Sequence, residues 1–222
     1  MTNRAYWPKL LGCAGGWLLF DITFYGNTLF APTMLKSVFH AHGATPVVGD
    51  RLEDNLSWQL AILALIGLPG YYVSVCLMDV IGRKRIQLQG FFMMALLYAF
   101  LGAFIHSLKH NAMLLLFVYG LTYFFSNFGP NSTTFILPAE TFPAEVRSSL
   151  NGFCAAAGKV GAALGSACFK PIVHAAGTGL VFYLCAVCAI LGFLVTALFV
   201  EDRRGRGMAV TGEGPSNDEL SR

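Results

Sequence analysis

Residues 171–200 read PIVHAAGTGLVFYLCAVCAILGFLVTALFV, an apolar stretch that contains no Asp, Glu, Lys or Arg. A membrane-spanning helix needs about 20 predominantly apolar residues. The sequence turns polar directly after this stretch, at Glu201-Asp202-Arg203-Arg204. The stretch therefore predicts a helix that crosses a bilayer and ends at this polar run.

The composition of the whole chain supports the same interpretation. Of its 222 residues, 55% are hydrophobic and 12% are charged, whereas soluble domains carry about 25% charged residues. The mean hydropathy is +0.60. These values exclude a disordered chain, a coiled coil and an ordinary soluble enzyme domain. The net charge of +3 is small, and the basic residues are scattered, so we expect no nucleic-acid partner.

Five further stretches are long and apolar in the same way, and each carries at most one charged residue. We therefore expect an all-α, polytopic membrane protein that forms a bundle of six transmembrane helices. The predicted spans are residues 10–35, 55–78, 86–108, 110–139, 148–169 and 171–200. A short N-terminal segment (1–9) and a disordered polar tail (201–222) flank this domain of residues 10–200.

The distribution of Lys and Arg predicts the orientation, because cytoplasmic loops carry an excess of these residues. If both termini are cytoplasmic, ten Lys and Arg residues lie in inner segments and four in outer segments. The inner set is Arg4, Lys9, Arg83, Lys84, Arg85, Arg147, Arg203, Arg204, Arg206 and Arg222, and the outer set is Lys36, Arg51, Lys109 and Lys170.

Two charged residues, Asp21 and Lys159, lie deep within predicted spans. Each costs about 2.5–3.5 kcal/mol at a helix centre, so such residues by default mark an ion or substrate pathway. The alternative is a structural pair that locks two helices together. Trp17, Asp21 and Tyr25 share one helix face. Because Trp and Tyr bring N–H and O–H donors to the carboxylate, this face favours the functional interpretation.

The fourth predicted span contains Asn127-Phe128-Gly129-Pro130-Asn131-Ser132-Thr133-Thr134. Pro130 removes a helix hydrogen bond, so we expect a kink at Gly129 and Pro130. Such breaks persist in membranes where they line a cavity or where neighbouring helices satisfy the backbone. Asn131 would then supply an amide at that depth. The alternative for the hydroxyl residues is hydrogen bonding between helices.

The fifth predicted span contains a small-residue motif, Gly161-x-x-x-Gly165, which predicts close packing on another helix. Two inner loops, residues 79–85 and 138–147, mix acidic and basic residues at helix ends. We interpret them as conformational latches whose ion pairs hold one face of a transporter shut. The alternative for the basic cluster is a topology signal only. The latch residues are Asp79, Gly82, Arg83, Lys84, Glu140 and Arg147.

No pairing of a nucleophile with a base and no clustered set of metal ligands stands out in the sequence. All five histidines fall in or beside predicted outer segments at scattered spacing. We therefore expect no enzymatic activity, no metal site and no cofactor.

The chain resembles the C-terminal half of a twelve-helix transporter of the major facilitator superfamily. Within this superfamily it is similar to the proton-coupled inorganic phosphate symporters of plants and fungi. The motifs that carry the resemblance are Trp17-x-x-x-Asp21-x-x-x-Tyr25, the run 127–135 and Gly158-Lys159-Val160-Gly161. The Gln-Gln-x-x-Gly-Ile-Asn and Pro-Trp motifs of sugar porters are absent from the corresponding positions of the sequence.

The resemblance implies a function and a set of ligands. The expected function is proton-coupled phosphate symport, and the family implies the plasma membrane. The implied phosphate ligands are Trp17, Asp21, Tyr25, Asn131 and Lys159. Lys159 would supply positive charge and Trp17, Tyr25 and Asn131 would supply donors. Asp21 would couple the proton, because a protonated carboxyl donates and no longer repels the anion. We also hypothesise that Lys159 pairs with Asp21 when the site is empty.

The resemblance covers one half of a two-half transporter, and substrate sites in such proteins lie between the halves. The chain is therefore expected to be a fragment, to pair with an N-terminal six-helix half, or to self-associate. Two other functions stay open: a porter for a sugar or an organic ion on the same scaffold, or a non-transporting product. The last class includes a truncated product, a phosphate sensor and a modulatory subunit.

Overall fold

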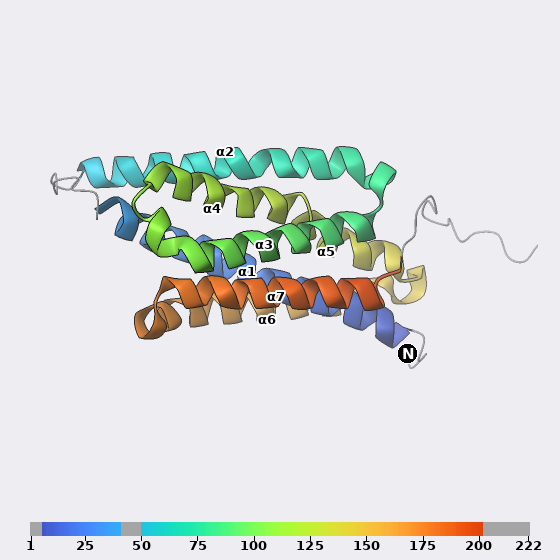
Figure 1. Cartoon of the computed structure of the whole chain (residues 1–222). Helices are drawn as coiled ribbons and strands as arrows, with labels where there is room; N and C mark the ends of the chain where they lie inside the picture. Colours follow the sequence, from blue (N-terminus) through green and yellow to red (C-terminus); the bar gives the residue numbers. More distant parts are fainter. Residues whose placement is uncertain (1–5, 41–49, 202–222) are drawn as a thin grey trace, which may run out of the picture.

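The computed structural model describes residues 6–40 and 50–201, and all regular secondary structure within these ranges is helical. Figure 1 shows the helices lying roughly side by side in one bundle. They are α1 (Tyr6–His40), α2 (Asp50–Ile81), α3 (Arg83–Leu108), α4 (Ala112–Asn127), α5 (Pro130–Thr141), α6 (Ala144–Ala176) and α7 (Thr178–Phe199). Apart from Glu201, the predicted disordered tail lies outside the described residues.

Two boundaries differ from the sequence-based expectation. The fourth predicted span forms two helices, α4 and α5, because the helix is interrupted between Asn127 and Pro130. The predicted boundary between the fifth and sixth spans, near Pro171, is wrong, because α6 continues through Pro171 to Ala176. The chain turns instead at Gly177, whose φ of 84° is in the left-handed region that favours glycine.

The predicted inner loops are also shorter than expected. A single residue, Gly82, separates α2 from α3, and its φ of 95° again favours glycine. Phe142 and Pro143 alone separate α5 from α6. Most of the predicted latch residues therefore lie on helix ends, where the backbone holds them in place.

The predicted glycine motif packs α6 directly onto α1. A Cβ atom added to Gly161 would collide with the backbone carbonyl oxygen of Leu18, and one added to Gly165 would collide with that of Ile22. Such contact between helix backbones is the role of small residues in membrane helix pairs. Because α1 and α6 lie this close, the side chains of Asp21 and Lys159 are brought to the same region.

The main apolar core lies between α3, α4 and α7, with contributions from α1 and α2. Its most buried large side chains include Phe91, Leu101, Leu115, Tyr119 and Phe182. This core fixes α4, and therefore the start of the break that leads into α5. The core thus positions the break relative to α1 and α2.

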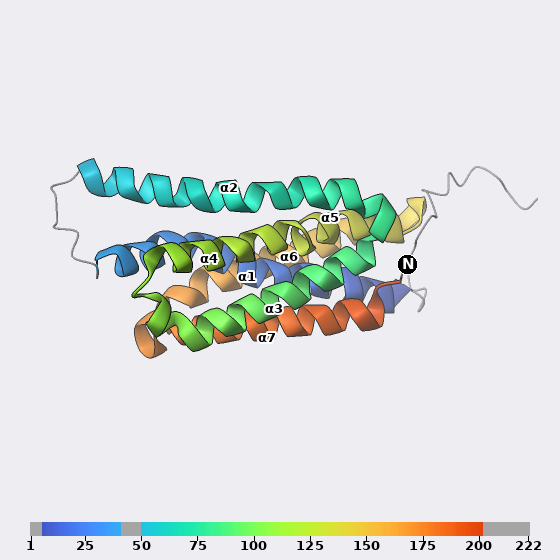
Figure 2. The same ribbon diagram turned by 45° about the horizontal axis from the view of Figure 1, so that its top comes forward.

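Within the described residues, five helical segments are long and apolar enough to cross a membrane, as judged by length and composition. They are Ser57–Ile81, Arg83–Leu108, Ala112–Thr141, Ala144–Ala176 and Thr178–Phe199. Helix α1 is outside this set and carries Lys9 and Asp21 among other polar residues. It lies within the same bundle (Figures 1 and 2) and spans 35 residues, so we treat it as the sixth span.

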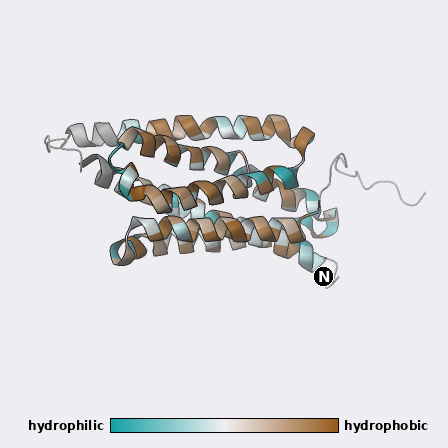
Figure 3. Ribbon diagram, viewed as in Figure 1, coloured by the Kyte–Doolittle hydropathy of each residue, from teal (hydrophilic) through white to brown (hydrophobic). Residues whose placement is uncertain are grey.

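The surface of the bundle suits a lipid environment. Long parts of the helices are hydrophobic, and hydrophilic residues gather mainly near the helix ends (Figure 3). Helix α2 lies at the edge of the bundle in both ribbon views (Figures 1 and 2). Its side chains Leu65, Tyr72 and Val75 are 74%, 67% and 68% exposed. Large apolar side chains so exposed are stable in lipid or against another helical surface.

Candidate functional site

A cavity of about 400 Å³ lies between α1, α2, α5 and α6. Its lining includes all five residues that the resemblance implies as ligands, which come from three different helices. They are Trp17, Asp21, Tyr25, Asn131 and Lys159. Helix α2 contributes Tyr71, which belongs to none of the sequence motifs.

Helix α1 supplies one wall of the cavity through the face that carries Trp17, Asp21 and Tyr25. Gly158 of α6 makes room for the Trp17 ring, since a Cβ atom there would lie 2.6 Å from the indole Nε1. The side chain of Trp17 lies close enough to the carboxyl group of Asp21 to interact with it. Asp21 is only 3% exposed, and its Oδ2 atom has no hydrogen-bond partner among the described residues. The carboxyl group therefore retains hydrogen-bonding capacity beside the cavity.

Lys159 of α6 supplies the positive charge of the cavity. Its Nζ atom donates to the Tyr25 hydroxyl at 3.4 Å and lies 5.2 Å from the centroid of the Tyr25 ring. Lys159 and Asp21 interact electrostatically. The hypothesised direct ion pair between them is absent from the ion pairs of the described residues. Tyr25 is the partner of Lys159 instead, because its hydroxyl lies within reach of the ammonium group.

The helix break brings Asn131 to the cavity. Gly129 packs against Gly90 of α3, and a Cβ atom on Gly129 would lie 2.6 Å from the Cα atom of Gly90. Pro130 occupies the first position of α5, where its missing N–H costs no helical hydrogen bond. The predicted break at Gly129 and Pro130 is therefore present, with close packing on α3 as its structural support.

The contacts of Asn131 differ from the donor role expected of it. Its Nδ2 atom donates to the Tyr71 hydroxyl at 2.6 Å and to Asn127 Oδ1 at 2.8 Å. A side-chain amide has two N–H donors, so these contacts use both. The Asn127 amide in turn donates to the carbonyl oxygen of Gly67 at 2.9 Å. In this structure Asn131 therefore has its carbonyl oxygen, and no N–H, left for a ligand.

The remaining polar groups of the lining set what the cavity can bind. The hydroxyls of Ser132 and Thr134 donate to backbone carbonyl oxygens of Asn127 and Pro130. Donors available to a ligand therefore include the Lys159 ammonium and the hydroxyls of Tyr25 and Tyr71. This set suits a small anion with several acceptor oxygens. The described ranges contain no group of three or more His, Cys, Asp or Glu residues that could hold a metal ion.

Little in the sequence distinguishes Tyr71 as a site residue. It is one aromatic residue in an apolar span, beside a second tyrosine, Tyr72. Tyr71 lines the cavity, whereas Tyr72 is not part of its lining. The contact with Asn131, which is 60 positions away in the sequence, distinguishes the two residues. Within α2 the nearest charged residue to Tyr71 is Asp79, eight positions away at the helix end.

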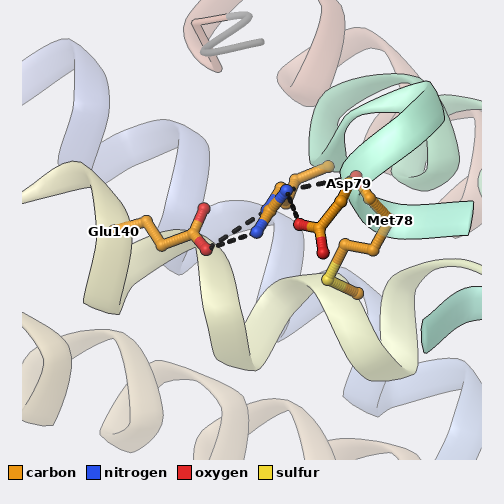
Figure 4. A network of polar contacts seen from close by, with 4 residues as sticks. Met78, Asp79 and Glu140 are labelled. Atoms are coloured by element: carbon orange, nitrogen blue, oxygen red, sulfur yellow. Dashed lines mark hydrogen bonds and ion pairs between the residues drawn. The ribbon is translucent and has the colours of Figure 1, made fainter. Parts of the chain in front are cut away.

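The two predicted latch segments meet through Arg83, which binds both Asp79 and Glu140. Figure 4 shows Asp79 and Glu140 on either side of this contact. Its Nη1 atom lies 2.7 Å from Asp79 Oδ1, and its Nη2 atom lies 3.0 Å from Glu140 Oε1 of α5. Nη1 also donates to the Met78 carbonyl oxygen at 3.1 Å. Gly82 forms the turn that sets Arg83 at the start of α3. Arg83 therefore links the end of α2 to the end of α5.

The other two predicted latch residues bind backbone groups. Lys84 Nζ donates to the carbonyl oxygen of Ala197 in α7 at 3.0 Å. Arg147 Nε donates to the carbonyl oxygen of Phe142 at 3.0 Å, which ties α6 to the connection from α5. These contacts join helix ends through backbone carbonyl groups.

Comparison with known protein families and structures gives one consistent group of relatives. The family profile described as "Sugar (and other) transporter" matches residues 23–209. The solved structure of a proton:xylose symporter of the major facilitator superfamily, XylE bound to 6-bromo-6-deoxy-D-glucose, superposes with a TM-score of 0.67 at 21% identity. That superposition covers 87% of this chain and 40% of XylE, so it supports the fold.

Curated relatives share more of the sequence. Inorganic phosphate transporter 1-6 of rice (Oryza sativa subsp. japonica) is 38% identical over 239 residues, which covers 97% of this chain and 44% of that protein. The inorganic phosphate transporter PHO84 of Saccharomyces cerevisiae is 37% identical over 209 residues, which covers 90% of this chain and 35% of that protein. The chain thus spans less than half the length of these relatives.

Proposed function

This chain belongs to the sugar (and other) transporter family of the major facilitator superfamily, and we propose that it supplies the C-terminal half of a proton-coupled inorganic phosphate symporter. Relatives at 37–38% identity that bear the name inorganic phosphate transporter support phosphate as the substrate. The single observation that carries the proposal is the cavity that brings Asp21, Lys159 and Asn131 together.

In the proposed mechanism, the cavity binds phosphate through charge and hydrogen bonds. Lys159 provides the positive charge, and the Tyr25 hydroxyl, which accepts from Lys159, keeps its own hydrogen available for a phosphate oxygen. Phosphate binding draws the Lys159 ammonium away from Tyr25 toward the anion. Trp17 lines the same cavity and interacts with the carboxyl group of Asp21.

Asp21 couples the proton in this mechanism. An ionised Asp21 repels phosphate, whereas a protonated Asp21 donates to it through a group that lies buried beside the cavity. A proton and a phosphate ion then favour each other's binding, and this coupling is reciprocal by thermodynamic necessity. Both ligands therefore load together and leave together, which is the requirement for symport.

The latch completes the transport cycle in this proposal. The contacts of Arg83 with Asp79 and Glu140 hold the cytoplasmic ends of α2, α3 and α5 together in one state. Rocking of this half against a second half breaks or remakes contacts of this kind. The second half is an N-terminal six-helix unit or another copy of this chain, packed on the cavity side. We place the protein in the plasma membrane with both termini in the cytoplasm.

Radiolabelled phosphate uptake tests the proposal in cells that lack their own phosphate transporters. The chain is expressed by itself and joined to an N-terminal six-helix half. We expect uptake that rises at acid pH, loses its pH dependence in Asp21→Asn and is abolished in Lys159→Ala. The matched control is Lys170→Ala, which changes an exposed lysine of the same helix outside the cavity lining and should leave uptake unchanged.

The outcomes separate the candidate functions. Uptake by the chain alone indicates a self-assembling half-transporter, and uptake only with the N-terminal half indicates one half of a conventional symporter. Absence of phosphate uptake in both forms contradicts the proposal. Proton-dependent accumulation that persists unchanged in Asp21→Asn contradicts the role of Asp21.

A further inference from the structure

A chain of hydrogen bonds fixes the side chain of Asn131 at the cavity wall. It begins at the carbonyl oxygen of Gly67 in α2, which accepts from Asn127 Nδ2 at 2.9 Å. Asn127 Oδ1 then accepts from Asn131 Nδ2 at 2.8 Å. The second N–H of Asn131 donates to the Tyr71 hydroxyl at 2.6 Å. This series of hydrogen bonds thus starts and ends on α2 and crosses the break between α4 and α5.

The direction of these bonds follows from their first member. A backbone carbonyl oxygen can only accept, so the nitrogen of the Asn127 amide must face Gly67. The oxygen of Asn127 consequently faces Asn131, which must present N–H to it. The usual ambiguity between the oxygen and nitrogen of an asparagine amide is therefore resolved by the network.

This direction determines what the wall offers to a ligand. Both N–H groups of Asn131 are used, and no contact in the described residues engages its Oδ1 atom. The Tyr71 hydroxyl already accepts a hydrogen bond, so its own hydrogen is available to donate. Asn131 and Tyr71 both line the cavity. The wall therefore presents one acceptor, Asn131 Oδ1, next to one donor, the Tyr71 hydroxyl.

We propose that Tyr71 and Asn131 form a specificity pair that selects a tetrahedral oxyanion bearing a hydroxyl group over one that bears none. The inference rests on the proposed phosphate transport and deepens it. Dihydrogen phosphate has both a P–OH group, which donates to Asn131 Oδ1, and a P–O⁻ oxygen, which accepts from Tyr71. Arsenate in the same protonation state has the same groups.

Sulfate is rejected for the complementary reason. At neutral pH sulfate carries no hydrogen, so one of its oxygens would face Asn131 Oδ1. Both oxygens are acceptors, so no hydrogen bond can form between them. A site built to hydrogen-bond a hydroxyl group discriminates against an analogue that lacks it, because the polar group of the site then stays unpaired. Asn131 does not titrate, so it presents the acceptor at every pH.

Tyr71→Phe tests the pair in cells expressing the transport-competent form of the chain. The measurement is competition of radiolabelled phosphate uptake by sulfate and by arsenate. Loss of the Tyr71 hydroxyl removes the donor and frees one N–H of Asn131 to face the cavity. We therefore expect the preference for phosphate over sulfate to fall by about tenfold or more, the size of one hydrogen bond to a charged group. The preference for phosphate over arsenate should stay unchanged.

A second variant and a matched control complete the test. Asn127→Ala removes the other acceptor of Asn131 without touching the cavity lining, so the same loss of sulfate discrimination is expected. Tyr72→Phe changes the neighbouring exposed tyrosine outside the lining and should keep the discrimination of the unmodified chain. The ratio of inhibition by the two anions does not depend on how much protein reaches the membrane.

The results distinguish the two proposals. Phosphate uptake with unaltered exclusion of sulfate in both Tyr71→Phe and Asn127→Ala overturns the specificity pair and leaves the proposed transport intact. Equal competition by sulfate and phosphate in the unmodified chain also overturns the pair. Failure of the unmodified protein to take up phosphate in any form overturns the transport proposal and the pair together.

Discussion

Replacing Gly161 with alanine tests whether the contact between the α1 and α6 backbones holds the cavity together. In the structure, a Cβ atom at Gly161 would lie 3.0 Å from the carbonyl carbon of Leu18 and 3.1 Å from its Cα atom, and closer still to its carbonyl oxygen. All three are backbone atoms of α1, so no side-chain rotation can relieve the collision. The two helices would have to separate.

The size of the effect follows from this separation. Non-bonded carbon atoms prefer a separation of about 3.5–4.0 Å, so α1 must move away from α6 by roughly 0.5–1 Å. A gap of that size loses about a quarter to a half of the dispersion energy of each contact along the interface. Overpacking of this kind costs about 1–3 kcal/mol. The helix propensity of alanine returns up to about 1 kcal/mol. Because the second effect occurs at any helical glycine, a matched variant can isolate the first.

Gly152→Ala is that variant. Gly152 lies on the same helix, and a Cβ atom there would meet nothing within 4 Å. Equilibrium unfolding in mixed detergent micelles, followed by helical circular dichroism, should show Gly161→Ala less stable than Gly152→Ala by about 1–3 kcal/mol. Phosphate uptake should also fall in Gly161→Ala, because Asp21 and Lys159 lie on the two helices that separate. Equal stability of the two variants would refute the close α1–α6 packing.

Two further variants probe the latch and the helix break. Arg83→Gln removes the charge that binds Asp79 and Glu140. We expect the free energy of unfolding to fall by about 1–2 kcal/mol, which is below the usual cost for a charged hydrogen-bonding group because the site is partly exposed. An unaltered free energy of unfolding would contradict this. Gly90→Ala places a Cβ atom 2.5 Å from Pro130 Cδ; it should be destabilised by about 1–3 kcal/mol in the same assay, and a stabilised protein would show that α5 moves freely.

The sequence predicts the helical class well because the physical signal for each span is local. Residues 171–200 lack charge over their whole length, and only a helix or a closed barrel satisfies the backbone of such a stretch in lipid. Asp21 and Lys159 are equally easy to identify in the sequence, since a charged residue in an apolar span has a large free-energy cost of membrane insertion. The boundary near Pro171 failed, because proline is tolerated inside a membrane helix and the turn depends on Gly177 instead.

The sequence by itself identified Asp21, Asn131 and Lys159 as candidate site residues, because charged and amide groups in apolar spans are recognised by residue type alone. Only the tertiary structure decided what these groups do to one another. Lys159 meets Tyr25 across 134 positions, and Asn131 meets Tyr71 across 60. An asparagine amide offers both donors and an acceptor, and which of them faces the cavity depends on neighbours that only folding brings into contact.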